Sequence, residues 1–454
     1  MAQESRPARQ EVDEATIPAI EPAGGTVSLE AATPGPRGPV KRLLDILGPG
    51  LITGASDDDP SGIGTYAIAG ASTGFATLWM ALFTFPMMSS VQFMCAKIGM
   101  VSGRGLAGVL RTYYTKPLLY LSVFGLVVAN TINAGADIGA IAAGFNLLLK
   151  WPLWIFIIAV SVTILVIQIW GSYRLIASVF KWLTLALFAY IGSALFAKPN
   201  IAEVIRGTFI PHIVWNGKFL ALVVAILGTT ISPYMFFWQS NQEVEEQIAV
   251  GRKTIRQRKG ASNLELKYAA LDVNIGMLFS NLVMYFIILA TAATLFKAGK
   301  TDIQSATDAA QALRPLAGRG AEALLAIGLI GAGFLAVPIL TGSSAYAVAE
   351  AFGWKHGLDN KPRRAKEFYG LIVISTIFGM LINFFGINPI KALFWSAVLN
   401  GFLAPPLLVL IIMISNNKRV MGQRGNGRLL NLLGWITAAV MTAAAGGLIA
   451  TWGQ

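Results

Sequence analysis

The chain has 454 residues, of which 55% are hydrophobic and 13% are charged, and its mean hydropathy is +0.62. This composition excludes an ordinary soluble protein, because the apolar runs repeatedly reach the ~20 residues that span a bilayer. The net charge of +12 does not indicate a nucleic-acid ligand, since most of the 35 Lys and Arg residues lie in predicted loops on one membrane face. We expect an all-α polytopic membrane protein.

Residues 1–45 contain many prolines and glycines and no apolar core, and they lack the plan of a signal peptide. We interpret them as a disordered cytoplasmic tail. The distribution of Lys and Arg predicts an integral protein of a bacterial plasma membrane with its N-terminus inside. About eleven transmembrane helices follow, at roughly 46–70, 75–99, 118–146, 152–170, 175–197, 216–240, 268–296, 322–350, 368–386, 391–414 and 430–450.

Two of these spans are interrupted. The first contains Asp59-Pro60-Ser61-Gly62, and the sixth contains Thr229-Thr230-Ile231-Ser232-Pro233-Tyr234. Broken helices at corresponding positions of two inverted halves are typical of the ion or substrate site of a transporter. We therefore predict one inverted repeat over 46–200 and a second over 201–415. A cytoplasmic loop and the eleventh span complete the chain at 416–454.

Asp59 is the principal candidate ligand, because a carboxylate at this depth is tolerated only where protein or water surrounds it. Asp58 ranks second and Asp57 third, since successive side chains point in different directions and all three cannot contact one ion. The two could instead form an acidic funnel or cap the outer half-helix. The other candidates are the hydroxyl or backbone oxygens of Ser61, Gly62, Thr229, Thr230 and Ser232.

The first break and its flanks resemble the Nramp family of divalent-metal transporters. The spacing of Gly48-Pro49-Gly50, Asp59-Pro60 and Ala69-Gly70-Ala71 carries the resemblance, together with Asn388-Pro389 and Met421-Gly422. The resemblance implies a leucine-transporter-type inverted repeat, spans 1–5 and 6–10, with helices 1 and 6 unwound at the metal.

The chain departs from the family at both motifs. Gly62 stands where the family has a metal-binding Asn, and Ser232-Pro233-Tyr234 replaces the family's Met-Pro-His. The remaining oxygen ligands suit Mg²⁺, Ca²⁺ and Mn²⁺ rather than softer metals. Both changes also predict a wider cavity that holds a partly hydrated ion. The pattern looks like the Nramp-related magnesium transporter branch, and Tyr234 becomes a secondary candidate.

The family's proton relay looks incomplete. The two histidines, His212 and His356, lie in predicted loops, and the family's acidic positions in span 3 fall on Ala134 and Asp137. The sequence leaves four interpretations of Asp137 open. It is a remnant of the proton relay, a residue that supports the metal ligands without contacting the ion, part of a water-filled path, or a residue that only makes hydrogen bonds to neighbouring groups. Asn400 in span 10 either approaches the ion or makes a polar helix contact.

We expect a secondary transporter that imports Mg²⁺, with Mn²⁺ tolerated, by alternating access and without proton coupling. The alternatives are a proton-coupled Mn²⁺/Fe²⁺ importer of the main Nramp type and a metal-binding membrane scaffold or receptor without transport. No phosphate loop or supported catalytic triad is present, so we do not expect an enzyme. The expected partners are the transported Mg²⁺ or Mn²⁺ and the lipid bilayer, with no other cofactor, no nucleic acid and no obligatory protein partner.

Overall fold

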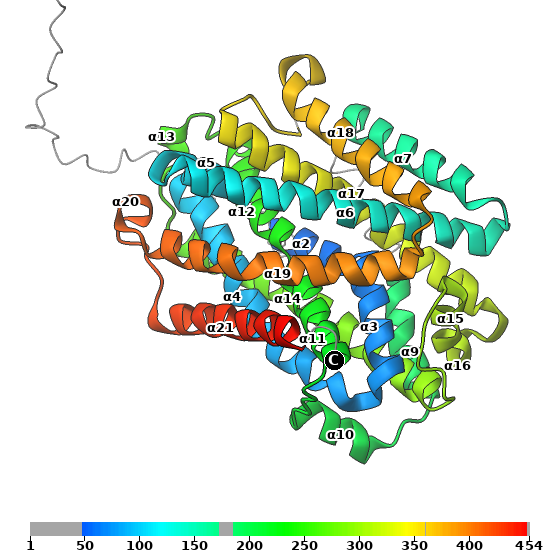
Figure 1. Ribbon diagram of the computed structural model, residues 1–454. Coiled ribbons are helices and arrows are strands. Elements are labelled where there is room, and N and C mark those ends of the chain that lie inside the picture. The colour runs from blue at the N-terminus through cyan, green and yellow to red at the C-terminus, as the bar shows by residue number, and fades with distance from the viewer. Residues whose placement is uncertain (1–47, 172–184, 359, 452–454) are drawn as a thin grey trace, which may run out of the picture. The chain divides into compact units, whose positions relative to one another are not determined.

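The computed structural model describes residues 48–171, 185–358 and 360–451, and these residues form helices joined by turns and loops (Figure 1). The predicted tail and the first part of the fifth span lie outside the described residues. Within the described part of the chain, nine helical segments are long and apolar enough to cross a membrane. The first span is present as two shorter helices, and the described end of the fifth span is shorter still.

The two predicted breaks are confirmed. The first span consists of α2 (Pro49–Asp57) and α3 (Pro60–Thr73), and the sixth consists of α11 (Gly217–Thr230) and α12 (Pro233–Ala249). A proline opens the second helix of each pair, where its missing N–H would have no helical partner in any case and its fixed φ suits the first turn. The sequence therefore ends one helix and starts the next inside each of these two spans.

The other spans follow in chain order. They are α4 (Trp79–Ser102), α6 (Lys116–Leu149), α7 (Leu153–Trp170), α9 (Ala189–Phe196) after a 3-10 turn at Leu185–Phe188, α14 (Asn263–Thr291) extended by a π turn at Ala292–Phe296, α17 (Ala321–Phe352), α18 (Lys366–Ile382), α19 (Pro389–Asn416) and α21 (Arg428–Ala450). Short helices connect them: α5 (Leu106–Tyr113), α10 (Ile201–Phe209), α13 (Ile255–Arg258), α15 (Ala306–Ala310), α16 (Arg314–Ala317) and α20 (Lys418–Met421).

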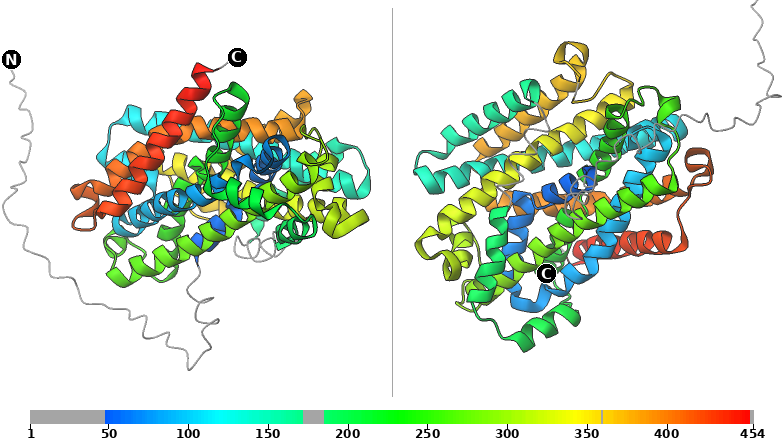
Figure 2. Two further views of the ribbon diagram at one scale, coloured as in Figure 1. Left: turned by 90° about the horizontal axis from the view of Figure 1, so that it is seen from below. Right: turned by 180° about the vertical axis from the view of Figure 1, so that it is seen from behind.

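The halves pack in matching ways. In both halves the second part of the broken helix packs against the second span of the other half: α3 lies against α14, and α12 lies against α4. In both halves the third span packs on the fourth: α6 on α7, and α17 on α18. The most extensive contact between two helices joins α6 to α17, the third spans of the two halves. Helices α2 and α3 lie inside the bundle among α6, α14 and α19, whereas α21 lies at its edge beside α19 (Figures 1 and 2). The break between α2 and α3 therefore lies in the interior of the helix bundle.

Glycines bring the broken helices against the backbone of their neighbours. A Cβ at Gly54 of α2 would lie 2.2 Å from the carbonyl oxygen of Gly276 in α14. On the opposite side, a Cβ at Gly228 of α11 would lie 2.1 Å from the carbonyl oxygen of Ala397 in α19. Neither contact leaves room for a side chain, so backbone packing holds both broken helices in place.

Candidate ion-binding site

Asp59 lies between α2 and α3 and caps the N-terminus of α3. Its Oδ1 accepts hydrogen bonds from the Gly62 backbone amide at 2.6 Å and the Ser61 hydroxyl at 2.8 Å. Helix N-termini favour such a carboxylate, because it pairs with free N–H groups and with the positive end of the helix dipole. The break in the helix thus fixes the position of the predicted principal ligand.

The other carboxylate oxygen of Asp59 is held by a residue from α6. Asn133 donates its side-chain amide to Asp59 Oδ2 at 3.0 Å, and its own Oδ1 accepts from the hydroxyl of Ser396 on α19 at 2.8 Å. Asn133 and Ser396 were not among the predicted ligands. The signal in the sequence is that both residues are polar and lie within apolar spans, which does not distinguish them from other polar residues there or identify the partner.

The hydroxyls of the sixth span are placed differently from one another. Thr229 Oγ1 lies 3.4 Å from Ser61 Oγ, so α11 reaches the hydroxyl that donates to Asp59. Ser232 donates its hydroxyl to the carbonyls of Gly228 and Thr229, at 2.6 and 2.8 Å. Thr230 donates to the carbonyl of Ile226 at 2.8 Å. The structure therefore joins Asp59, Ser61 and Thr229, while the hydroxyl protons of Ser232 and Thr230 bond to α11.

The space beside Gly62 is narrow in this structure. A Cβ at this position would lie 3.3 Å from the Asp57 carbonyl oxygen, from Thr229 Oγ1 and from a ring carbon of Tyr66. The sequence predicts a wider cavity here. In the structure an added Cβ would require the Tyr66 ring and Thr229 to shift by a few tenths of an ångström. Tyr66 follows Gly62 by one helical turn and was not singled out from the sequence.

Asp57 and Asp58 face another helix. The hydroxyl of Ser280 on α14 contacts Asp57 Oδ2 and lies 3.3 Å from Asp58 Oδ1. The two carboxylates therefore turn toward α14, whereas Asp59 is bonded to α3 and α6. The three successive carboxylates therefore have different partners.

Tyr234 connects the two breaks. Its hydroxyl donates to the Ser56 carbonyl in the last turn of α2 at 3.0 Å. Its own carbonyl accepts from the Ser343 hydroxyl of α17 at 2.8 Å. The start of α12 is thereby tied to the end of α2.

Asp137 and Asn400 are buried with polar atoms that have no hydrogen-bond partner in the structure. Both Asp137 oxygens are in this state. Both amide atoms of Asn400 are likewise without a partner. Buried polar groups are costly when unpaired, so both side chains suit contact with water or an ion.

The candidate site is enclosed. Every site residue predicted from the sequence is buried, and those with polar side chains expose 1% or less of their surface. An ion that reaches Asp59 from water must therefore wait for helices to move.

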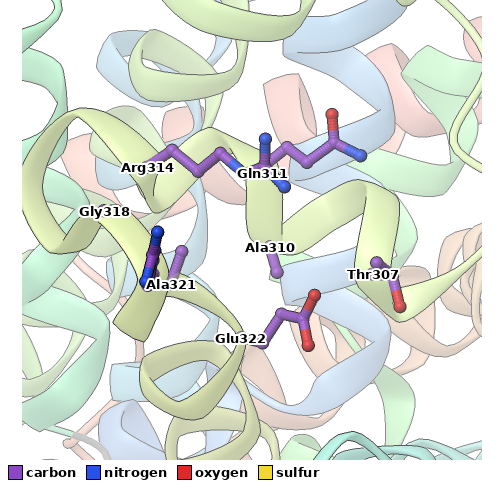
Figure 3. Close-up of a pocket in the computed structure, with 8 residues that line it drawn as sticks. Thr307, Ala310, Gln311, Arg314, Gly318, Ala321 and Glu322 are labelled. Atoms are coloured by element: carbon purple, nitrogen blue, oxygen red, sulfur yellow. The ribbon is translucent and has the colours of Figure 1, made fainter.

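A pocket of about 330 Å³ lies elsewhere, at the start of α17 (Figure 3). Its lining includes Arg314 and Arg319, whose positive charges repel a dication. It shares no residue with the Asp59 site, and we do not assign the ion to it. The lining is formed by Thr307, Ala310, Gln311, Arg314, Gly318, Arg319, Ala321 and Glu322.

A family model described as natural resistance-associated macrophage protein-like, Nramp, matches residues 50–451. The chain belongs to the Nramp family. The divalent metal cation transporter MntH of Bacillus subtilis (strain 168) is 30% identical to this Nramp chain over 405 residues, which cover 88% of the chain and 91% of the relative. MntH of Klebsiella pneumoniae (strain 342) is 27% identical over 414 residues, with 90% and 94% covered.

Solved structures show the fold of this Nramp chain. A manganese transporter of Eremococcus coleocola, in complex with an aromatic bis-isothiourea substituted compound, matches with a TM-score of 0.71 at 20% identity, covering 92% of this chain and 88% of the other. Mhp1, a nucleobase-cation-symport-1 family transporter in a closed conformation, matches with a TM-score of 0.59 at 15% identity, covering 89% and 90%. The predicted leucine-transporter-type fold is confirmed.

Proposed function

We propose that this chain imports Mg²⁺, with Mn²⁺ tolerated, as a partly hydrated ion by alternating access around Asp59. The observation that carries the proposal is the donor set at the first break. Asp59 accepts hydrogen bonds from the Ser61 hydroxyl and the Asn133 side-chain amide, and the Thr229 hydroxyl lies 3.4 Å from that of Ser61. Mg²⁺ prefers oxygen ligands and gives up its water reluctantly, so one carboxylate with hydroxyl and water oxygens suits it.

The positions of the family's other ligands support the same choice. Gly62 offers no side chain, and Ser232 presents a hydroxyl where the family resemblance implies a thioether. A softer transition metal would lose its preferred ligand at this position. We accordingly place the chain in the Nramp-related magnesium transporter branch, with a cytoplasmic N-terminus in a bacterial plasma membrane and no cofactor besides the transported ion.

The membrane potential is sufficient to drive import. Moving one elementary charge through 100 mV yields about 2.3 kcal/mol, and a dication gains about twice that. A proton gradient is not needed on energetic grounds, so the proposal includes no proton coupling.

Proton-coupled Mn²⁺ import is the second candidate. The matching relatives are named divalent metal cation transporters, and a matching structure is that of a manganese transporter. Asp137 also favours this candidate, because it is a buried carboxylate near the break whose oxygens have no hydrogen-bond partner in the structure. A carboxylate in such a place can carry a proton.

Reconstituted liposomes separate these candidates. The purified chain is placed in vesicles that contain a Mg²⁺ indicator and a pH-sensitive dye, and a potential that is negative inside is imposed. We expect Mg²⁺ entry without acidification, and loss of entry in Asp59→Asn. Acidification that accompanies metal entry would support the proton-coupled candidate.

Asp302→Asn is the matched control, because it removes a carboxylate from an exposed loop. We expect it to transport like the wild type. Unchanged Mg²⁺ entry in Asp59→Asn would defeat the assignment of the site. No entry of Mg²⁺ or Mn²⁺ in the wild type would favour a metal-binding scaffold or receptor.

A further inference from the structure

We propose that Asn133 becomes a metal ligand when the ion binds, by turning its side-chain amide over so that Oδ1 replaces Nδ2 beside Asp59. This inference rests on the proposed function, because it concerns the ion held at Asp59. It assigns the amide ligand of this site to α6, whereas the family resemblance places an amide ligand at position 62, which is Gly62 here.

The ion-free arrangement fixes one orientation of the amide. An ionised carboxylate only accepts hydrogen bonds, so the group that faces Asp59 Oδ2 at 3.0 Å must be the NH₂ of Asn133. The carbonyl oxygen Oδ1 then faces the hydroxyl of Ser396 at 2.8 Å, and that hydroxyl donates to it. Asn133 and Ser396 expose 0% and 1% of their surface, so water does not compete for these bonds.

A cation at Asp59 reverses the preference. The partial positive charge of the NH₂ group would face the ion, whereas Oδ1 is an oxygen ligand of the kind that Mg²⁺ and Ca²⁺ accept. Turning the amide over brings Oδ1 to the ion and points Nδ2 at Ser396. The metal therefore supplies the free energy for the change.

Ser396 makes both orientations possible. A hydroxyl is one donor and also an acceptor, and Ser396 Oγ lies 2.8 Å from the Leu393 carbonyl as well as 2.8 Å from Asn133 Oδ1. After the turn, Ser396 donates its proton to the Leu393 carbonyl and accepts from Asn133 Nδ2. Each polar group then has a partner in both states, so the buried network does not oppose the change.

Asn130 on the same helix provides the contrast. It is also a buried amide, but its Nδ2 donates to the Leu340 carbonyl at 3.1 Å and faces the Ser344 hydroxyl at 3.0 Å. Turning this amide over would set Oδ1 against a carbonyl oxygen, which cannot donate. Asn130 therefore stays in one orientation and serves as a matched control.

A cysteine substitution tests whether position 133 contacts the ion. The natural Cys95 is first replaced by Ala, which leaves no other thiol. Asn133→Cys and Asn130→Cys are then compared with the Cys-free parent for Cd²⁺ binding and for the thiolate-to-metal absorption band of a Cd–S bond. Thiolates are soft ligands that bind such a metal strongly. We expect at least a tenfold gain in Cd²⁺ affinity and an absorption band for Asn133→Cys alone.

No gain and no band in Asn133→Cys, or an equal gain in Asn130→Cys, would overturn the assignment.

A second pair of variants covers the case in which the cysteine variant does not fold. Asn133→Asp keeps an oxygen and Asn133→Leu removes it, so Mg²⁺ binding should survive in the first and weaken at least tenfold in the second. Equal affinities in these two variants, both eluting as monodisperse protein, would also overturn the inference.

The experiment separates this inference from the proposed function. If wild-type vesicles take up Mg²⁺ and Asp59→Asn vesicles do not, the function stands whatever Asn133 does. If the wild type takes up neither Mg²⁺ nor Mn²⁺, the proposed function fails, and Cd²⁺ binding still reports whether position 133 faces a cation.

Discussion

The carboxylate of Asp272 in α14 accepts a 2.6 Å hydrogen bond from the backbone amide of Gly50, in the first turn of α2. The amides of Gly48 and Leu51 donate to the same carboxylate at 2.9 and 3.1 Å. Together they satisfy backbone groups that a helix start leaves unpaired and set a negative charge at the positive end of the helix dipole. Asp272 thus ties the start of the first broken helix to α14.

Asp272→Ala should release the start of α2. A charge in a partly buried helix-terminus contact is worth up to about 2 kcal/mol, which corresponds to roughly a thirtyfold change in population. We expect several-fold faster modification of a cysteine placed at Leu51 by a membrane-impermeant thiol reagent, in a Cys95→Ala background. Asp272→Glu keeps a carboxylate and is the control. Equal modification rates with and without Asp272 would show that this contact does not hold α2.

Gly54→Ala should separate α2 from α14. The added Cβ would lie 2.2 Å from the Gly276 carbonyl oxygen, so a helix must move. Overpacking of this kind costs about 1–3 kcal/mol, and we expect a lower unfolding temperature in detergent together with slower Mg²⁺ uptake. Gly446→Ala is the control, because its Cβ would meet nothing within 4 Å. An unfolding temperature for Gly54→Ala equal to that of the control would contradict the packing described here.

Gly62→Asn restores the amide that the family resemblance implies, but its Cβ would lie 3.3 Å from the Tyr66 ring and from Thr229 Oγ1, so these neighbours must shift. We expect Gly62→Asn alone to reduce Mg²⁺ uptake. Adding Tyr66→Ala makes room, so the double variant should recover uptake and gain Mn²⁺ relative to Mg²⁺. A double-mutant cycle on the two affinities measures the coupling. Additive effects of the two substitutions would mean that Tyr66 does not limit the space at position 62.

Tyr234→Phe removes the hydrogen bond from the start of α12 to the Ser56 carbonyl while keeping the ring. A buried hydrogen bond of this kind contributes about 1 kcal/mol. If the bond only ties the two broken helices, the maximal rate of Mg²⁺ uptake should change several-fold while the equilibrium affinity, measured by calorimetry, stays the same. A large loss of affinity instead would indicate that the Tyr234 oxygen contacts the ion.

The fold was largely predictable because its signals are local. Pro60 and Pro233 mark the starts of α3 and α12, and runs of apolar residues mark the spans. Hydropathy nevertheless placed span ends only approximately: α6 reaches Lys116–Leu149, whereas the prediction was 118–146. Loops and helix ends carry no apolar signal, so these boundaries depend on capping and packing.

The candidate site was only partly predictable. Asp59, Ser61 and Thr229 were proposed together and the structure brings them together, because the carboxylate and the breaks are visible in the sequence. The partner Asn133 was not found, because it lies in an unbroken span and no break or motif marks its position, whereas Thr229 lies at a visible break. The hydroxyl direction of Ser232 depends on its rotamer, and composition carries no information about rotamers.

Enclosure of Asp59 also has an electrical consequence. Under the proposed function the ion binds among buried residues, so ions would not follow one another through an open path and each passage would require one complete cycle of helix movement. Current should therefore scale with the number of molecules and saturate with Mg²⁺ concentration, without the discrete steps of single channels. Its temperature dependence should be steep, as expected for rearranging helices rather than for ions diffusing in a pore.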